Sequence, residues 1–306
     1  MSIELLISVF VAAVQCGTPI LFATLGEIIT ERAGVLNLGV EGMMAMGAFI
    51  SFFVAYTTGN IWLATLAGGL IASLLALLHG LVCIDFQGNQ VVSGLALTIL
   101  STNLSNYLGT PLLGTISEGF KPFKLPILGD IPYIGTIFFQ HDALVYVSYI
   151  LPFALWFFLE RTRYGLHLRA VGEYPYAAIA VGINPNTIRY TALFAGGFLI
   201  GMGGAYLSLS YTHLWANNLV AGRGWIAIAL VIFAFWQPIR AVFGVYFFGG
   251  VMAFQLRLQA SGTSIPSSIL LMLPYALTII ALFFSSKKRK RFASPKALGI
   301  NLEPRE

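Results

Sequence analysis

Long apolar runs dominate this sequence, and they restrict its possible folds more than any other feature. A helix needs about 20 mostly apolar residues to cross the hydrocarbon core of a bilayer. The sequence predicts an all-α polytopic membrane protein with about nine transmembrane helices, within a range of eight to ten. These are Leu5–Ile28, Leu38–Ala55, Ile61–Ile84, Gln90–Leu108, Leu144–Leu159, Ile188–Leu209, Trp225–Trp236, Ala241–Leu256 and Ile269–Phe284.

Composition agrees with this class. The 306 residues are 58% hydrophobic and only 9% charged, whereas a soluble domain carries about 25% charged residues. The net charge of +5 is therefore interpreted as a topology signal and not as a nucleic-acid-binding surface. Cys16 and Cys83 stand alone in apolar runs, which predicts neither a disulfide framework nor a metal site.

Basic residues are distributed unequally over the connections between the predicted helices. Thirteen fall on one side: Arg32, Arg161, Arg163, Arg169, Arg189, Arg240, Lys287, Lys288, Arg289, Lys290, Arg291, Lys296 and Arg305. Four fall on the other side: Lys121, Lys124, Arg223 and Arg257. Because cytoplasmic connections are enriched in Lys and Arg, we expect the N terminus outside and the C terminus inside. Residues 1–286 form one transmembrane domain, and 287–306 form a basic cytoplasmic tail that also meets anionic lipid.

The connection at residues 161–187 carries an ordered pattern for a cytoplasmic loop. Glu173, Pro175 and Gly182 suit the start, the first turn and the end of a short helix. Asn184 suits the N-cap of the following helix. This favours a docking element for another protein, and the alternative is an ordinary cytoplasmic loop.

A second long connection, residues 109–142, lies on the predicted outer side. It is rich in Pro and Gly, and loops of this length are usually functional or mobile. We expect it to fold over the outer mouth, with Ile131–Phe139 as a short interfacial or re-entrant piece.

The fourth predicted helix is too polar to face lipid all round. At about 100° per residue its polar side chains share one face, and they are Gln90, Thr98, Ser101, Thr102 and Ser105. A polar stripe of this kind faces a bundle interior or a watery cavity. We interpret it as lining a translocation pathway for a neutral polyhydroxy solute; the alternative is hydrogen bonding that only holds helices together.

Two further features concern helix packing and gating. Glu27, Asn37 and Glu41 lie among glycines between the first two apolar runs, and we assign them a structural or gating role. The alternative is a loop that dips toward the membrane surface. Gly197 and Gly201 are four residues apart, a spacing that allows close helix approach, either within this chain or at a seam between subunits.

Two segments together resemble a known family. They are GEIITERAGVLNLGVEGMMAMGAF and RTRYGLHLRAVGEYPYAAIAVGINPNTIRYTALFAGGFLIGMGGAYLSL. They are similar to permease subunits of bacterial ATP-binding-cassette (ABC) importers for branched-chain amino acids, monosaccharides and nucleosides. The similarity is greatest to the shorter permeases of simple-sugar or guanosine-type systems. It runs from about Leu21 to Phe284, and NQVVSGLALTILSTNLSNYLG fits the corresponding family segment.

The resemblance implies how such a chain works. In that family a short coupling helix in one cytoplasmic loop contacts a partner ATPase. Carried over, the coupling residues are Arg169, Gly172, Glu173, Tyr174, Pro175, Ala177, Ala178 and Gly182. Family members often have Asn where this chain has Tyr174, which leaves the contact at that position open. Sugar-permease relatives commonly have one more N-terminal span, whose absence fits an outside N terminus.

We therefore expect a permease subunit in a bacterial cytoplasmic membrane that imports a nucleoside or simple sugar. The implied partners are ABC ATPase subunits, a second permease in a heterodimer and an extracytoplasmic substrate-binding protein, but no nucleic acid. The chain has no phosphate-binding GxxxxGK[ST] loop, HExxH or GxSxG motif. We thus expect no enzyme activity and no bound cofactor, with ATP and Mg in the partner. The alternative is a self-contained secondary transporter or channel, for which only Glu27 and Glu41 could supply ionisable groups.

Overall fold

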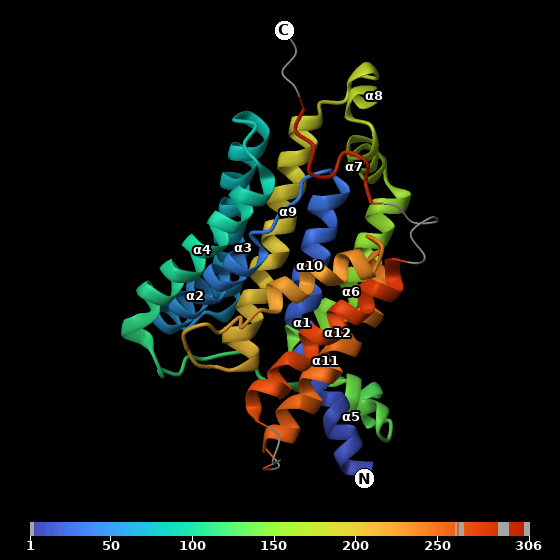
Figure 1. The fold of residues 1–306 in the computed structure, drawn as a ribbon. Helices are drawn as coiled ribbons and strands as arrows, with labels where there is room; N and C mark the ends of the chain where they lie inside the picture. The colour runs from blue at the N-terminus through green and yellow to red at the C-terminus, as the bar shows by residue number, and fades with distance from the viewer. Residues whose placement is uncertain (1–2, 261, 263–265, 287–293, 303–306) are drawn as a thin grey trace.

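The computed structural model describes residues 3–260, 262, 266–286 and 294–302, which form a bundle of helices (Figure 1). The helices are α1 (Ile3–Arg32), α2 (Val40–Thr58), α3 (Ile61–Gly80), α4 (Gln90–Gly109), α5 (Ile134–Phe138), α6 (Ala143–Arg161), α7 (Arg163–Glu173), α8 (Pro175–Ala180), α9 (Pro185–Tyr206), α10 (Arg223–Phe233), α11 (Pro238–Ala260) and α12 (Ser267–Ser286). Two short strands, β1 (Phe123–Lys124) and β2 (Gln140–His141), pair antiparallel. The predicted all-helical membrane class is confirmed.

Six helical stretches among the described residues are long and apolar enough to cross a membrane. They are Leu6–Arg32, Val40–Thr58, Ile61–Asp85, Ala143–Arg161, Pro185–Tyr211 and Pro238–Ala260. Helix α4 is long enough to span a membrane, but it is too polar to be one of these six stretches. Helix α12 has 20 residues, and the side chains of only some of them are described. Helix α10 has 11 residues, about 16 Å at 1.5 Å per residue and so roughly half a bilayer core. The count of nine stays a prediction.

The two ends of the bundle carry different elements. The N terminus lies at one end, and α7, α8 and the described C-terminal residues lie at the other (Figure 1). This agrees with the predicted placement of the 161–187 connection and the tail on one side, opposite the N terminus. The basic residues 287–291 and Arg305 lie outside the described residues. Which end faces the cytoplasm remains a prediction from the charge distribution.

The predicted outer loop, residues 109–142, is folded rather than extended. It contains the β1–β2 pair and the five-residue helix α5, which falls within the predicted piece Ile131–Phe139. Its first part is held to the segment before α10. The N–H of Gly114 donates to the Trp215 carbonyl at 3.0 Å, and that of Phe120 to Leu209 at 2.9 Å. The loop therefore fixes where the chain turns back toward α10.

Helix α9 lies at the centre of the bundle, where its glycines allow close contact with α1, α2 and α3. A Cβ on Gly196 would lie 2.6 Å from the Gly26 carbonyl oxygen of α1, and one on Gly201 would lie 2.3 Å from that of Gly68 in α3. On the next turn, a Cβ on Gly204 would meet the Met44 oxygen of α2 at 2.1 Å. Backbone contacts this close require glycine. The packing interpretation of the glycine stripe is thus confirmed within one chain, including Gly197, whose Cβ would meet the Ala72 oxygen at 2.8 Å.

We predict that Gly204→Ala destabilises the protein by about 1–3 kcal/mol. The new methyl group would overlap the α2 backbone at Met44 and Ala48. The matched control is Gly250→Ala in α11, where the nearest atom to a Cβ is 3.8 Å away. Alanine there should be neutral or stabilising by roughly 0.5–1 kcal/mol, since it is the better helix former. Thermal unfolding in detergent measures both. Equal transition temperatures for the two variants would contradict the central role of α9.

Candidate functional site

The α7–α8 connection folds as two short helices joined at Tyr174. Thr162 caps α7 by accepting the N–H of Gly165 at 3.0 Å. Pro175 opens α8, as predicted, and Gly182 ends the turn after it with φ +83°. Asn184 caps α9 by accepting the N–H groups of Asn186 and Thr187. The predicted short helix and the cap are confirmed, but the preceding helix α7 was not predicted, so Glu173 ends α7 rather than standing in a loop before α8.

Helix α8 presents only part of its predicted contact residues to the outside. Ala177 and Tyr174 are exposed, whereas Pro175 is buried and Ala178 is 3% exposed within the main core. Ala178 therefore packs α8 onto the core and is not on the surface that a partner can touch in this conformation. The outward surface of α8 is formed by Tyr176, Ala177, Ala180 and Val181.

Helix α7 lies directly on the end of α1. A Cβ on Gly172 would be 2.0 Å from the Arg32 carbonyl oxygen, so the two backbones touch. Leu168 and Val171 of the same helix are buried. Arg169 pairs with Glu160 of α6 at 3.0 Å, and both side chains are partly exposed. Glycine is therefore required where α7 meets the end of α1.

The connection between α1 and α2 is held by buried carboxylates. Glu27 accepts the backbone N–H and the side-chain amide of Asn37, both at 3.2 Å, and the Asn37 oxygen accepts the Gly39 N–H at 2.9 Å. One turn later, Glu31 accepts the indole N–H of Trp236 at 2.5 Å. The side chains of Glu27, Glu31 and Asn37 are at most 1% exposed, and Trp236 is 7% exposed. Burial of polar groups is tolerated here because each finds a partner.

Glu41 serves a different element, the half-length helix α10. Its carboxylate accepts the backbone N–H groups of Gly222 and Gly224, each at 2.7 Å. The first N–H groups of a helix have no intrahelical acceptor, and the helix dipole favours a negative charge beside them. Arg223, between the two glycines, donates to the Leu219 and Val220 carbonyls. Glu41 thus fixes the start of α10, and nothing in the sequence pattern predicted that partner.

The polar stripe of α4 faces the interior of this chain. Gln90 accepts the Leu36 N–H at 2.8 Å, and Thr98 donates to the Leu38 carbonyl at 2.9 Å. Gly42 of α2 packs against Thr98 and Ser101. The opposite face carries exposed apolar residues, with Ile99 at 65% and Leu100 at 57%. In this conformation the stripe holds α4 to α2 and the α1–α2 connection, and a role in translocation stays a prediction.

The C-terminal end of the stripe borders a small cavity of about 10 Å³. Thr102, Ser105 and Trp215 line it, and Thr102 Oγ1 and Trp215 Nε1 have no hydrogen-bond partner among the described residues. That space is about the least that holds one water molecule. Ser101 Oγ is likewise unpartnered in the described part of the chain, whereas Ser105 donates to the Thr102 carbonyl within α4.

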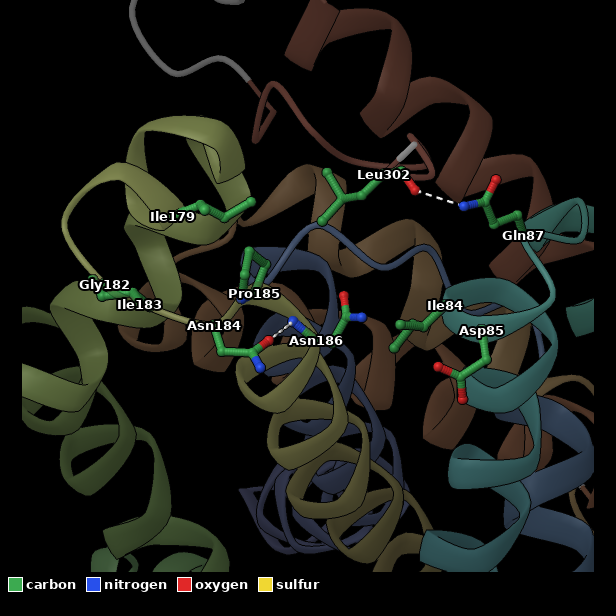
Figure 2. Close-up of a pocket in the computed structure, with 10 residues that line it drawn as sticks. All are labelled: Ile84, Asp85, Gln87, Ile179, Gly182, Ile183, Asn184, Pro185, Asn186 and Leu302. Atoms are coloured by element: carbon green, nitrogen blue, oxygen red, sulfur yellow. Dashed lines mark hydrogen bonds between the residues drawn. The ribbon is translucent and has the colours of Figure 1, made fainter. Parts of the chain in front are cut away.

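A groove of about 610 Å³ lies beside α8, at the end of the bundle that carries α7 and α8 (Figure 2). It separates the α8–α9 connection from the π-helical turn Leu81–Asp85 that ends α3. Asp85 accepts the hydroxyl of Tyr190 at 2.5 Å. The lining residues are Ile84, Asp85, Gln87, Ile179, Gly182, Ile183, Asn184, Pro185, Asn186 and Leu302. In the described parts of the chain, no three His, Cys, Asp or Glu side chains gather as a metal site.

Comparison with known proteins agrees with this architecture. The family described as "Branched-chain amino acid transport system / permease component" matches residues 9–282. A Haloferax volcanii protein provisionally named as a glucose ABC transporter permease is 44% identical over 253 residues, covering 81% of this chain and 77% of its own. The guanosine ABC transporter permease protein NupQ of Bacillus subtilis is 36% identical over 98% of both chains. The nucleoside ABC transporter permease protein NupC of Lactococcus lactis is 34% identical over 93% of both.

The match covers nearly all the described helices, and several relatives exceed 30% identity over most of their length. Permease subunits of this kind are not themselves enzymes, which agrees with the expectation from the sequence. The chain therefore belongs to the branched-chain amino acid transport system permease family and is a multi-pass subunit of an ABC transporter in the cytoplasmic membrane.

Proposed function

We propose that this permease imports a nucleoside or a simple sugar. The similarity to NupQ carries the proposal, because it extends over 98% of both chains and that protein is named a guanosine permease. The 44% identical Haloferax volcanii protein, provisionally named for glucose, supports the sugar alternative. Both solutes are neutral and rich in hydroxyl groups. The uncharged stripe of α4 offers hydroxyl and amide groups suited to them, provided that α4 separates from α2 during transport.

The proposed driving force comes from a partner ATPase that binds ATP and Mg. We place its docking surface on the outward side of α8, with Tyr176, Ala177, Ala180 and Val181, beside the groove of Figure 2. The other expected coupling residues would then position this helix rather than all contact the ATPase. They are Arg169, Gly172, Glu173, Tyr174, Pro175, Ala178 and Gly182. Gly172 is the point at which a push on α8 and α7 reaches α1.

The other proposed partners are a second permease and an extracytoplasmic substrate-binding protein. Bacillus subtilis has another protein named as a guanosine ABC transporter permease, NupP, which is 22% identical to this chain over 294 residues. A guanosine system with two different permeases supports a heterodimer here. The exposed apolar face of α4 must meet either lipid or such a partner.

A self-contained carrier or channel is less well supported. Such a protein needs ion-coordinating groups that are available at mid-membrane. Glu27 is engaged by Asn37, and Glu41 by the start of α10. Both carboxylates are therefore already used in holding connections together, which favours the structural over the carrier interpretation.

The substrate class can be tested by uptake. We expect vesicles containing this permease, its ATPase, its partner permease and its binding protein to accumulate labelled guanosine or glucose only when ATP is present. Excess unlabelled substrate of the same class should compete, whereas a branched-chain amino acid should not. Accumulation without ATP hydrolysis would instead support the carrier alternative.

The docking surface can be tested with Ala177→Trp. A bulky side chain on the outward face of α8 should weaken ATPase binding at least roughly tenfold, about 1.4 kcal/mol, without disturbing the core. Thr57→Trp, exposed at the far end of α2, is the matched control and should bind normally. Co-purification of the ATPase at a series of concentrations measures the difference. Normal binding by Ala177→Trp would place docking elsewhere.

The α4 stripe can be tested with a cysteine at Ser101 in a background without Cys16 and Cys83. Ser101 is 1% exposed, so the resting protein should protect the cysteine from a small water-soluble thiol reagent. If the stripe lines the pathway, labelling should rise during ATP-driven transport. A cysteine at Leu100, on the opposite face, should show no such rise. Protection of position 101 throughout transport would support a purely structural stripe.

A further inference from the structure

Residues 294–302, which we call the strap, cross the end of the bundle that carries α7 and α8 (Figure 1). Ala297 is 4% exposed, and its N–H donates to the Gly172 carbonyl of α7 at 2.9 Å. Two residues later, the N–H of Gly299 donates to the Gly34 carbonyl in the α1–α2 connection at 3.3 Å. The strap therefore joins α7 and the α1–α2 connection through backbone groups.

The other end of the strap is tied to the α3–α4 connection. The Asn301 amide donates to the carbonyls of Gln87 and Gly88 at 2.7 and 3.0 Å. Its oxygen accepts the Gln90 amide at 2.9 Å. Gln87 in turn donates to the Leu302 carbonyl at 2.8 Å, the bond drawn in Figure 2. One side chain, Asn301, thus uses both its donor and its acceptor to hold a connection far away in sequence.

A buried arginine lies beneath the strap. Arg189, in the first turns of α9, is 1% exposed, and its Nη2 donates to the Ile300 carbonyl at 3.2 Å. Its Nε has no hydrogen-bond partner among the described residues. A buried cation is costly unless acceptors surround it. Removing the strap would take away an acceptor and open the cation to water, so the start of α9 also depends on these residues.

The strap has an ordered local structure of its own. The N–H of Leu298 donates to the Pro295 carbonyl at 3.1 Å, and Gly299 has φ +75°, a conformation that favours glycine. Lys296 lies over the ring of Tyr174, at the junction between α7 and α8, 4.4 Å from the ring centroid. The strap therefore contacts the α7–α8 junction, the α1–α2 connection, the α3–α4 connection and α9 at once.

We propose that the strap is a coupling clamp, which makes these four elements move as one body. A displacement of α7 and α8 by the ATPase would then reach α1, α2, α4 and α9 together, rather than α1 alone through Gly172. Coupling of this kind needs a continuous set of packed and hydrogen-bonded groups between the two sites. The proposal rests on the docking role of α8 proposed above, and it assigns Ala297 and Asn301 as positioning residues.

The test uses the full chain assembled with its ATPase, its partner permease and its binding protein. Ala297→Glu forces a charge into a buried site, and Asn301→Ala removes three hydrogen bonds. Both should lower substrate-stimulated ATP hydrolysis and uptake roughly tenfold, within the range typical of coupling between two sites. Basal ATP hydrolysis and ATPase retention should stay normal. Ile300→Ser is the matched control, because that side chain is 54% exposed and only its backbone carbonyl is used.

Hydrogen exchange of the strap amides in the isolated permease shows whether the variants unseat it, and this measurement needs no partner. Faster exchange in Ala297→Glu together with lost stimulation supports the clamp. Faster exchange with full stimulation overturns it. Loss of ATPase retention would also overturn it, because the strap would then belong to the docking surface. Failure of the docking role itself appears separately, as normal ATPase binding by Ala177→Trp.

Discussion

The rest of this structure depends on the direct contact of the α9 backbone with α1, α2 and α3. Three turns of α9 present glycine to three different neighbours, and a Cβ at these positions would lie 2.1–2.6 Å from a carbonyl oxygen. In a membrane no hydrophobic force distinguishes a helix neighbour from lipid, so close van der Waals packing must supply the association. Because α9 also follows α8 directly, these close backbone contacts lie in continuity with the proposed docking element.

Polar groups in this protein are concentrated where helices are interrupted. Three buried glutamates are each matched to a connection: Glu27 to the α1–α2 connection, Glu31 to the turn before α11, and Glu41 to the start of α10. A broken helix leaves backbone N–H groups without acceptors, and in a bilayer these must be satisfied by the protein. Glu27 and Glu41 accept such backbone N–H groups, whereas Glu31 accepts the indole N–H of Trp236. Their engagement also weakens the case for an ion-coupled carrier.

The end of the bundle around α7 and α8 is held by two kinds of contact. The α7 and α1 backbones meet directly at Gly172, and the hydrogen bonds of Asn301 hold the strap to the α3–α4 connection. An ABC transporter has to turn a change in one subunit into a change in another, and it needs a rigid element to receive the displacement. Helix α8 alone has six residues and is too short to be rigid by itself. It is held by the burial of its own Pro175 and Ala178 and by the helices on either side.

The sequence by itself determined the helical membrane class, the order of the main helices and the local structure from Pro175 to Asn184. These follow from apolar length, from Pro175 in a first turn, from Gly182 past a helix end and from Asn184 as a cap. All of these signals act between residues that are close in sequence, so they can be recognised from the sequence alone. The polar stripe of α4 was also readable as a single face, since helical periodicity places Gln90, Thr98 and Ser101 together.

Only the tertiary structure decided what those features contact. The partners of Glu41, Glu31 and Asn301 lie 181, 205 and 214 residues away in the chain, and no spacing rule connects residues so distant. Helix α7 escaped prediction because its polar surface resembles a loop until α1 is placed against Gly172. Ala178 was expected on a docking surface because small residues suit either a partner or a core. Only the packing of the bundle could distinguish the two, because burial is a property of the assembled helices and not of the residue.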